Sequence, residues 1–133
     1  VLPRVMLDWI PGRKCAAHFF IVGDKAPNSL AGFIEGGRAM QRFWLTATRL
    51  GLQYQPEMTP LIFSHYIRDG RRFTESDPAM AEAASLKKQL AGLIGEADLS
   101  TCVFMGRVGY GPYPSARSIR LPVDRLAKSL QVT

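Results

Sequence analysis

The stretches TCVFMGRV, at residues 101–108, and AAHFFIV, at residues 16–22, decide how the rest of this chain can fold. Residues 16–22 form a continuous apolar run of strand length, rich in aromatic and β-branched residues, and each of the two stretches leads into a glycine. Such runs are typical of buried strands. We therefore predict two buried strands. We expect His18, within the first of them, to be a hydrogen-bonded residue of the core or of a sheet edge and not a catalyst.

Two helical patterns lie between these strands. In the first, apolar residues recur at spacings of three and four up to Leu50, and Gly51 supplies a left-handed end. The residues of its predicted core face are Ala39, Met40, Phe43, Trp44, Ala47 and Leu50. In the second, we expect Asp77 to cap the helix, Pro78 to take the first helical position and Gly95 to end it.

The remaining segments have weaker patterns. Residues 1–15 predict a short extended segment followed by a Pro-Gly turn. LIFSHYI, residues 61–67, suits a short helix or a strand. We interpret LQYQPEMTP, residues 52–60, as irregular because two prolines interrupt it, and EADLS, residues 96–100, as a short connection. The order strand, helix, helix, strand is typical of an α/β or α+β fold.

The composition is that of one globular domain, residues 1–133. No apolar run reaches the roughly 18 residues of a membrane-spanning helix, and the N-terminus has no secretory signal pattern, so we expect a soluble, cytoplasmic protein without membrane contact. The net charge of +6, from 17 basic and 11 acidic residues, suggests an anionic ligand, nucleic acid or membrane surface. Because the basic residues are dispersed and form no nucleic-acid-binding signature, a nucleic-acid partner is disfavoured.

The cysteines and histidines predict neither a disulfide nor a metal site. Cys15 and Cys102 lie far apart, no CxxC pair exists, and only His18 and His65 could add ligands. We therefore expect a reducing environment and free thiols. We also expect no nucleophilic residue, since no cysteine or serine occupies a recognised nucleophile elbow or is predicted to lie beside a histidine.

The segment GYGPYPSARSIRLP, residues 109–122, is the candidate anion site. Its glycines and prolines fix a backbone path after the second strand, and Arg117 and Arg120 carry fork-shaped donors suited to phosphate oxygens. Ser115 and Ser118 add hydroxyl groups. The alternative is a solvated loop whose tyrosines serve only in packing.

Three segments, in this order, resemble the later part of the flavin (FMN)-dependent nitroreductase-like family. They are GGRAMQRFWLTATRLGL at residues 36–52, QPEM at 55–58, and VFMGRVGYGPYPSARSIRLP at 103–122. The resemblance covers residues 16–126. It implies helices packed on a small, mostly antiparallel sheet. Family chains usually begin with helices that carry an Arg-Arg-Ser-type motif, and nothing before His18 resembles it, so we expect the C-terminal portion of the usual fold.

Site residues follow from the same resemblance. It implies that Arg117 and Arg120 hold the flavin phosphate, with Ser118 as a helper. It places Pro56, Glu57 and Met58 along the isoalloxazine ring.

The implied function is that of an oxidoreductase in which FMN takes hydride from NADH or NADPH and passes it to a nitroaromatic, quinone or similar acceptor. Because the cofactor performs the redox chemistry, no acid–base pair of the protein is required. Family members form intertwined homodimers with the flavin at the subunit interface, so we expect a homodimer. The alternative is a non-catalytic domain that binds flavin or another nucleotide, including as part of a larger polypeptide.

Overall fold

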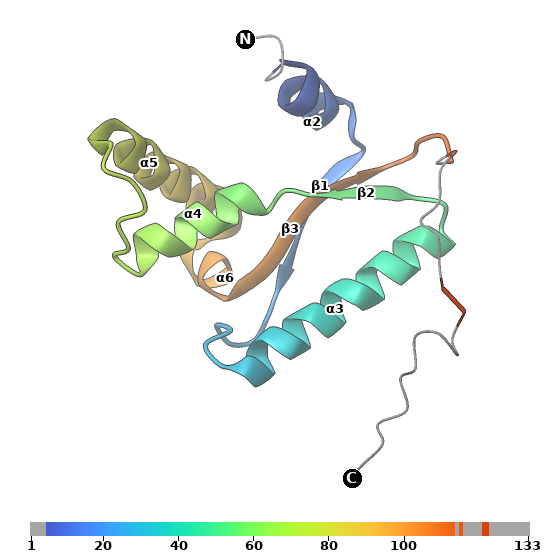
Figure 1. Ribbon diagram of the computed structural model, residues 1–133, viewed down its shortest axis with the longest axis horizontal. Coiled ribbons are helices and arrows are strands. Elements are labelled where there is room, and N and C mark those ends of the chain that lie inside the picture. The colour runs from blue at the N-terminus through green and yellow to red at the C-terminus, as the bar shows by residue number, and fades with distance from the viewer. Residues whose placement is uncertain (1–4, 114, 116–120, 123–133) are drawn as a thin grey trace.

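The computed structural model describes residues 5–113, 115 and 121–122. Its elements, in chain order, are a π-helical turn η1 (Val5–Trp9), α2 (Ile10–Lys14), β1 (Ala17–Val22), α3 (Leu30–Arg49), β2 (Gln53–Pro56), α4 (Met58–Arg68), α5 (Asp77–Ile94), α6 (Glu96–Thr101) and β3 (Cys102–Gly109) (Figure 1). This mixture of helices with a small antiparallel sheet confirms the predicted class. Within the described part of the chain, no helix has the length and apolar character needed to cross a bilayer.

The sheet has three strands in the order β1-β3-β2, and both pairings are antiparallel. Because β3 is paired along both sides, it is the most buried strand, as its sequence predicts. β1 is an edge strand, and its first residues, Ala17 and His18, are exposed. The prediction of full burial was therefore wrong for β1, whereas the expectation of an edge position for His18 is confirmed.

The apolar core fills the side of the sheet that faces α4, α5 and α6. Its buried members are Leu61, Leu90, Leu99, Cys102 and Met105, with Phe20, Met58, Ala91 and Ile94 packed around them. Met105 reaches this core from the middle of β3. The central strand and three helices thus share one set of contacts, which positions the start of α4 beside the sheet.

The other face of the sheet carries aromatic side chains beneath α3. Phe19 stacks on Phe43 of α3 with ring centroids 4.1 Å apart, and Phe104 lies 5.9 Å from Phe19. Gly36 lets the helix approach the sheet closely, since a Cβ atom there would lie 3.2 Å from that of Val103. Figure 1 shows α3 running diagonally past the strands, on the side away from α4 and α5.

The two long helices end where the sequence signals predict, and serines cap their starts. Ser29 caps α3 by accepting from the Gly32 amide at 3.2 Å, and Gly51 follows the helix with φ of 73°. Ser76, rather than the expected Asp77, caps α5. Asp77 instead accepts from Arg72 at 2.8 Å.

Three local predictions were wrong, because a proline in the segment or the shortness of the helix left no recognisable sequence pattern. Residues 5–14 are helical, since Pro11 lies in the first turn of α2, where its missing N–H costs nothing. Gln53–Pro56 is a strand, because a proline is tolerated at the end of an edge strand. Glu96–Thr101 is a helix of fewer than two turns, too short to show a period.

The predicted core face of α3 is only partly correct. Ala47 is buried and Phe43 is half-buried, but Trp44 and Leu50 are 52% and 61% exposed. A second apolar stripe lies on the exposed side of the same helix, and its members are Leu30, Phe33, Ile34, Trp44 and Leu45. A helix with apolar residues on both sides gives no sequence signal that tells which side faces the sheet.

Gly106 tests how tightly the three strands fit. An added Cβ would lie 2.6 Å from the carbonyl oxygen of Gln55 and 3.1 Å from the Phe19 ring, so Gly106→Ala must displace backbone in the middle of the sheet. We predict a loss of about 1–3 kcal/mol in the free energy of unfolding, measured by urea denaturation.

Gly92→Ala is the matched control, because no atom lies within 4 Å of a Cβ built at this position in α5. This change is expected to leave stability unchanged or to raise it by up to about 1 kcal/mol, since alanine favours a helix over glycine. Equal effects of the two substitutions would contradict the packing argument.

Candidate functional site

Three polar side chains form a row across the sheet, on the face that carries α4 and α5. His18 of β1 and Gln55 of β2 are both directly paired with Arg107 of the central strand. Directly paired residues of antiparallel strands project to the same face, so the three side chains lie next to one another. The register of the sheet alone brings together residues that are up to 89 positions apart in sequence, from 18 to 107.

Arg107 is the centre of this row. It is only 7% exposed, and its guanidinium donates from Nη1 to Oε1 of Glu57 and from Nη2 to Oε1 of Gln55, both at 2.7 Å. A buried charge is tolerated only when it is paired and hydrogen-bonded. The amide of Glu57 also donates to the carbonyl of Met105 at 3.0 Å, so backbone and side chain both hold the junction between β2 and α4.

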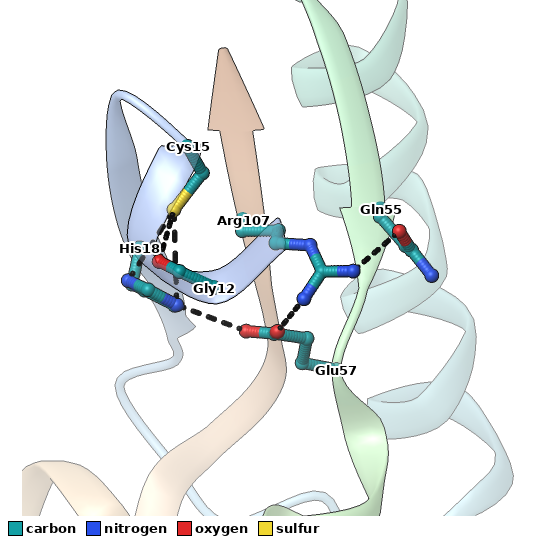
Figure 2. A network of polar contacts seen from close by, with 6 residues as sticks. All are labelled: Gly12, Cys15, His18, Gln55, Glu57 and Arg107. Atoms are coloured by element: carbon teal, nitrogen blue, oxygen red, sulfur yellow. Dashed lines mark hydrogen bonds and ion pairs between the residues drawn. The ribbon is translucent and has the colours of Figure 1, made fainter. Parts of the chain in front are cut away.

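Glu57 connects Arg107 to a histidine and a cysteine, as Figure 2 shows. Its second oxygen, Oε2, lies 3.4 Å from Nε2 of His18. Sγ of Cys15 lies 3.7 Å from Nδ1 and 3.9 Å from Nε2 of the same ring. The Cys15 thiol also donates to the carbonyl oxygen of Gly12 at 3.1 Å. A continuous polar path therefore runs from the thiol through the imidazole and the carboxylate to the guanidinium.

The expectation that neither cysteine lies beside a histidine was wrong. Cys15 follows α2, the helix missed at the N-terminus, and His18 is the second residue of β1. The turn between the two elements brings their side chains together. The spacing Cys-x-x-His was visible in the sequence, but it predicts contact only once the change from helix to strand between the two residues is known.

An open cavity of about 1000 Å³ adjoins the row. Its polar end is formed by His18, Gln55, Glu57 and Arg107, and its apolar wall by Pro60, Phe63, Phe73 and Met105. α5 closes the remaining side with Glu82, Leu86 and Gln89, among others. Such a combination of apolar walls with a few fixed polar groups is typical of small-molecule sites.

The predicted cofactor residues fall into three groups. Pro56 and Glu57 line the cavity. Met58 is instead packed against the apolar core. Arg117, Ser118 and Arg120 lie outside the described residues. Sequence reasoning missed Arg107, Gln55 and the pair Cys15 and His18.

The charges around the cavity suit an uncharged aromatic ring with polar atoms better than a phosphate group. Arg107 contributes one positive charge, but its guanidinium already donates to Glu57 and Gln55. The lining also includes the carboxylates of Glu57 and Glu82, which repel an anion. The apolar walls fit a flat aromatic ring, whereas a phosphate would have to be held by groups other than these lining residues.

Comparisons of the chain with protein-family models, with curated proteins and with solved structures found no match. Among the residues that the structure describes, no group of three or more His, Cys, Asp and Glu side chains could hold a metal ion.

His65, on α4, lies apart from the row and has a different environment. Its Nε2 atom is buried and lacks a hydrogen-bond partner among the described residues. Burial, reinforced by the nearby charge of Arg68, lowers the pKa of His65 below its ordinary value, although Asp69 and a backbone hydrogen bond with Leu99 oppose this. The neutral imidazole is therefore the form that the fold accommodates.

This histidine makes stability depend on pH. In the unfolded chain His65 has an ordinary pKa near 6.5, so as the pH falls below this value the unfolded state binds more protons than the folded state. The stabilisation is present above pH 6.5 and is lost as the pH falls through the lowered pKa. We predict that the free energy of unfolding declines from pH 7 to pH 5, and that the decline is shallower in His65→Gln, as measured by urea denaturation.

Above pH 8, His65 is neutral in the folded and in the unfolded chain. The free energies of unfolding of wild type and His65→Gln should therefore differ by a constant amount in that range. Parallel curves from pH 8 down to pH 5 would contradict the role of His65.

Proposed function

We propose that this chain is the flavin-binding part of an NAD(P)H-dependent oxidoreductase whose acceptor is a nitroaromatic, quinone or similar compound. The observation that carries the proposal is the place of Pro56 and Glu57. These residues come from the segment that resembles the ring-contacting loop of the nitroreductase-like family, and both line the cavity of about 1000 Å³. The ordered resemblance of the other two segments supports the same function.

The lining residues suit an isoalloxazine ring. Phe63, Phe73 and Met105 offer an apolar surface to a flat ring system. Oε1 of Gln55 accepts a hydrogen bond from Arg107. This contact fixes the orientation of the amide, so its nitrogen can donate to a carbonyl oxygen or a nitrogen of the flavin ring. When bound, the flavin supplies the hydride chemistry. The protein orients the ring and limits the access of water to it.

The phosphate end of the cofactor is assigned to Arg117, Ser118 and Arg120. These residues follow β3, the strand that also carries Arg107, after the short segment 110–116. The excess of basic residues in the chain favours an anionic ligand. Because two carboxylates line the cavity, a phosphate bound there would be repelled, which supports an arrangement with the ring inside and the phosphate beyond the lining.

We also propose that the protein is a homodimer joined through α3. The exposed stripe of Leu30, Phe33, Ile34, Trp44 and Leu45 has the spacing of one helix face, and Gly37 and Gln41 divide it into two groups. Exposed apolar surface of this kind marks interaction sites. Gly37 lies in the middle of the stripe, with no atom within 4 Å of a Cβ built there. Leu30 and Trp44 each lie seven residues from Gly37, so two antiparallel copies crossing at Gly37 would place one against the other.

Cofactor binding tests the oxidoreductase proposal. The purified protein is expected to bind FMN, turn yellow and oxidise NADH or NADPH when a quinone is added. Arg117→Ala and Arg120→Ala are each expected to weaken FMN binding about 10-fold to 100-fold, since a hydrogen bond to a charged group contributes about 1.5–3 kcal/mol. Titration of FMN fluorescence measures this change.

Arg72→Ala is the control, because Arg72 is exposed and pairs with Asp77 at the start of α5. It should leave FMN binding unchanged. A protein that neither binds FMN nor oxidises NAD(P)H would contradict the proposal. Binding without oxidation would support the non-catalytic flavin domain instead.

Analytical ultracentrifugation tests the dimer. Phe33→Glu places a charge in the apolar stripe and should convert a wild-type dimer to a monomer at micromolar concentration. Leu93→Glu is the matched control, because Leu93 is 75% exposed on α5, away from α3. A monomeric wild-type protein, or dissociation by both substitutions, would refute the α3 interface.

A further inference from the structure

The contacts among Cys15, His18 and Glu57 have no part in the flavin proposal, which needs no nucleophile from the protein. They join a thiol, an imidazole and a carboxylate in the order of a nucleophile, its base and the group that orients the base (Figure 2). The three residues come from three places in the chain: the end of α2, the edge strand β1 and the start of α4.

The imidazole lies within reach of the thiol and of the carboxylate, but Sγ of Cys15 is almost equally far from the two ring nitrogens and so lies over the ring, not along the Nδ1 lone pair. A turn of this exposed ring about its Cβ–Cγ bond is needed to point Nδ1 at the sulfur. Nε2 of His18 lies 3.4 Å from Oε2 of Glu57, which is an ion-pair distance. In the tautomer that carries its proton on Nε2, beside this carboxylate, Nδ1 holds the lone pair. Glu57 cannot swing away easily, because its other oxygen accepts from Arg107 at 2.7 Å. Arg107 is itself buried and held by Gln55. Glu57 is thus a positioning residue for His18.

The simpler interpretation of Cys15 is a structural thiol that donates to the Gly12 carbonyl. Cys102 provides the comparison within the same chain. It is 0% exposed, it belongs to the apolar core, and burial raises the pKa of its thiol. Cys15 is only half-buried and lies beside the exposed ring of His18. Transfer of the thiol proton to His18 requires rotation of the S–H bond away from Gly12 together with the turn of the imidazole.

We propose that Cys15 is a nucleophilic thiol that accepts acyl groups from activated esters or thioesters, with His18 as its base. The thiol proton passes to Nδ1 of His18, and the sulfur electron pair forms a bond to the acyl carbon. The bond from that carbon to the leaving oxygen or sulfur breaks, and the leaving group takes the proton from His18. Water then hydrolyses the new thioester, which releases the carboxylic acid and restores the thiol. No oxidant or reductant is consumed.

The neighbouring cavity defines the class of acyl group. His18 lines its polar end, and its walls are formed by Phe63, Phe73, Met105 and other apolar side chains. An acyl chain with an apolar body can therefore lie along these walls with its carbonyl group at the His18 end. The carbonyl must extend past His18 to reach Cys15, which is not one of the lining residues. Glu57 and Glu82 lie on the same lining and disfavour acyl groups that carry a negative charge.

Acylation of the flavin-free full chain by p-nitrophenyl butyrate tests this proposal. We expect a burst of one equivalent of nitrophenolate and a butyryl adduct on the peptide that contains Cys15, detected by mass spectrometry. Cys15→Ser should abolish the burst, although Cys102 is still present. His18→Ala should slow acylation about 100-fold or more, and added imidazole should restore part of the rate. Because no flavin or NAD(P)H is used, the outcome is independent of the oxidoreductase test.

His65→Gln is the matched histidine control, since His65 lies on α4 with its Nε2 atom buried, and this change should leave the burst rate unaltered. Glu57→Gln should slow acylation in the presence of His18 but have no further effect in the His18→Ala background, because a positioning residue acts only through the group that it holds. An adduct that is absent from Cys15, or a rate that His18→Ala leaves unchanged, would overturn the proposal.

Discussion

A buried guanidinium on the central strand is the constraint on which the rest of the site depends. Arg107 lies on β3, where neighbours on both sides exclude water, so its charge must find partners within the protein. Gln55 and Glu57 provide them at 2.7 Å. Loss of one partner from a buried pair leaves an uncompensated charge, which costs much more than the pair contributes. The end of β2 and the start of α4 are therefore held to the sheet by electrostatics as well as by packing.

The two faces of the sheet pack against different helices and leave different surfaces exposed. On one face, Met105 joins a closed apolar core shared with α4, α5 and α6, and the polar row opens into a cavity at the end of this core. On the other face, α3 covers the aromatic side chains of the strands but presents a second apolar stripe away from them. Gly106 allows β2 to pair closely with β3 and Phe19 to pack beneath α3, since a Cβ there would meet the backbone oxygen of Gln55 and the Phe19 ring.

The junction between β2 and α4 is common to both proposed chemistries. In the flavin proposal, Pro56 and Glu57 border a bound ring, and the reactive group belongs to the cofactor. In the acyl-transfer proposal, Glu57 orients His18, and the reactive atom is Sγ of Cys15. The two proposals use different residues for chemistry but the same support. A rigid junction of this kind supplies the fixed geometry that either a cofactor or a nucleophile requires.

The sequence by itself determined the elements whose signals are local. The stretch at 101–108 predicted the buried strand β3, and Gly51 and Gly95 marked the ends of the two long helices, because a left-handed or otherwise unusual backbone favours glycine. Only the tertiary structure decided which side of α3 meets the sheet, that Gln53–Pro56 is a strand, and that His18 lies opposite Arg107. Those features depend on strand register and on which surfaces are buried together. No short window of sequence contains that information, since the residues that meet are tens of positions apart.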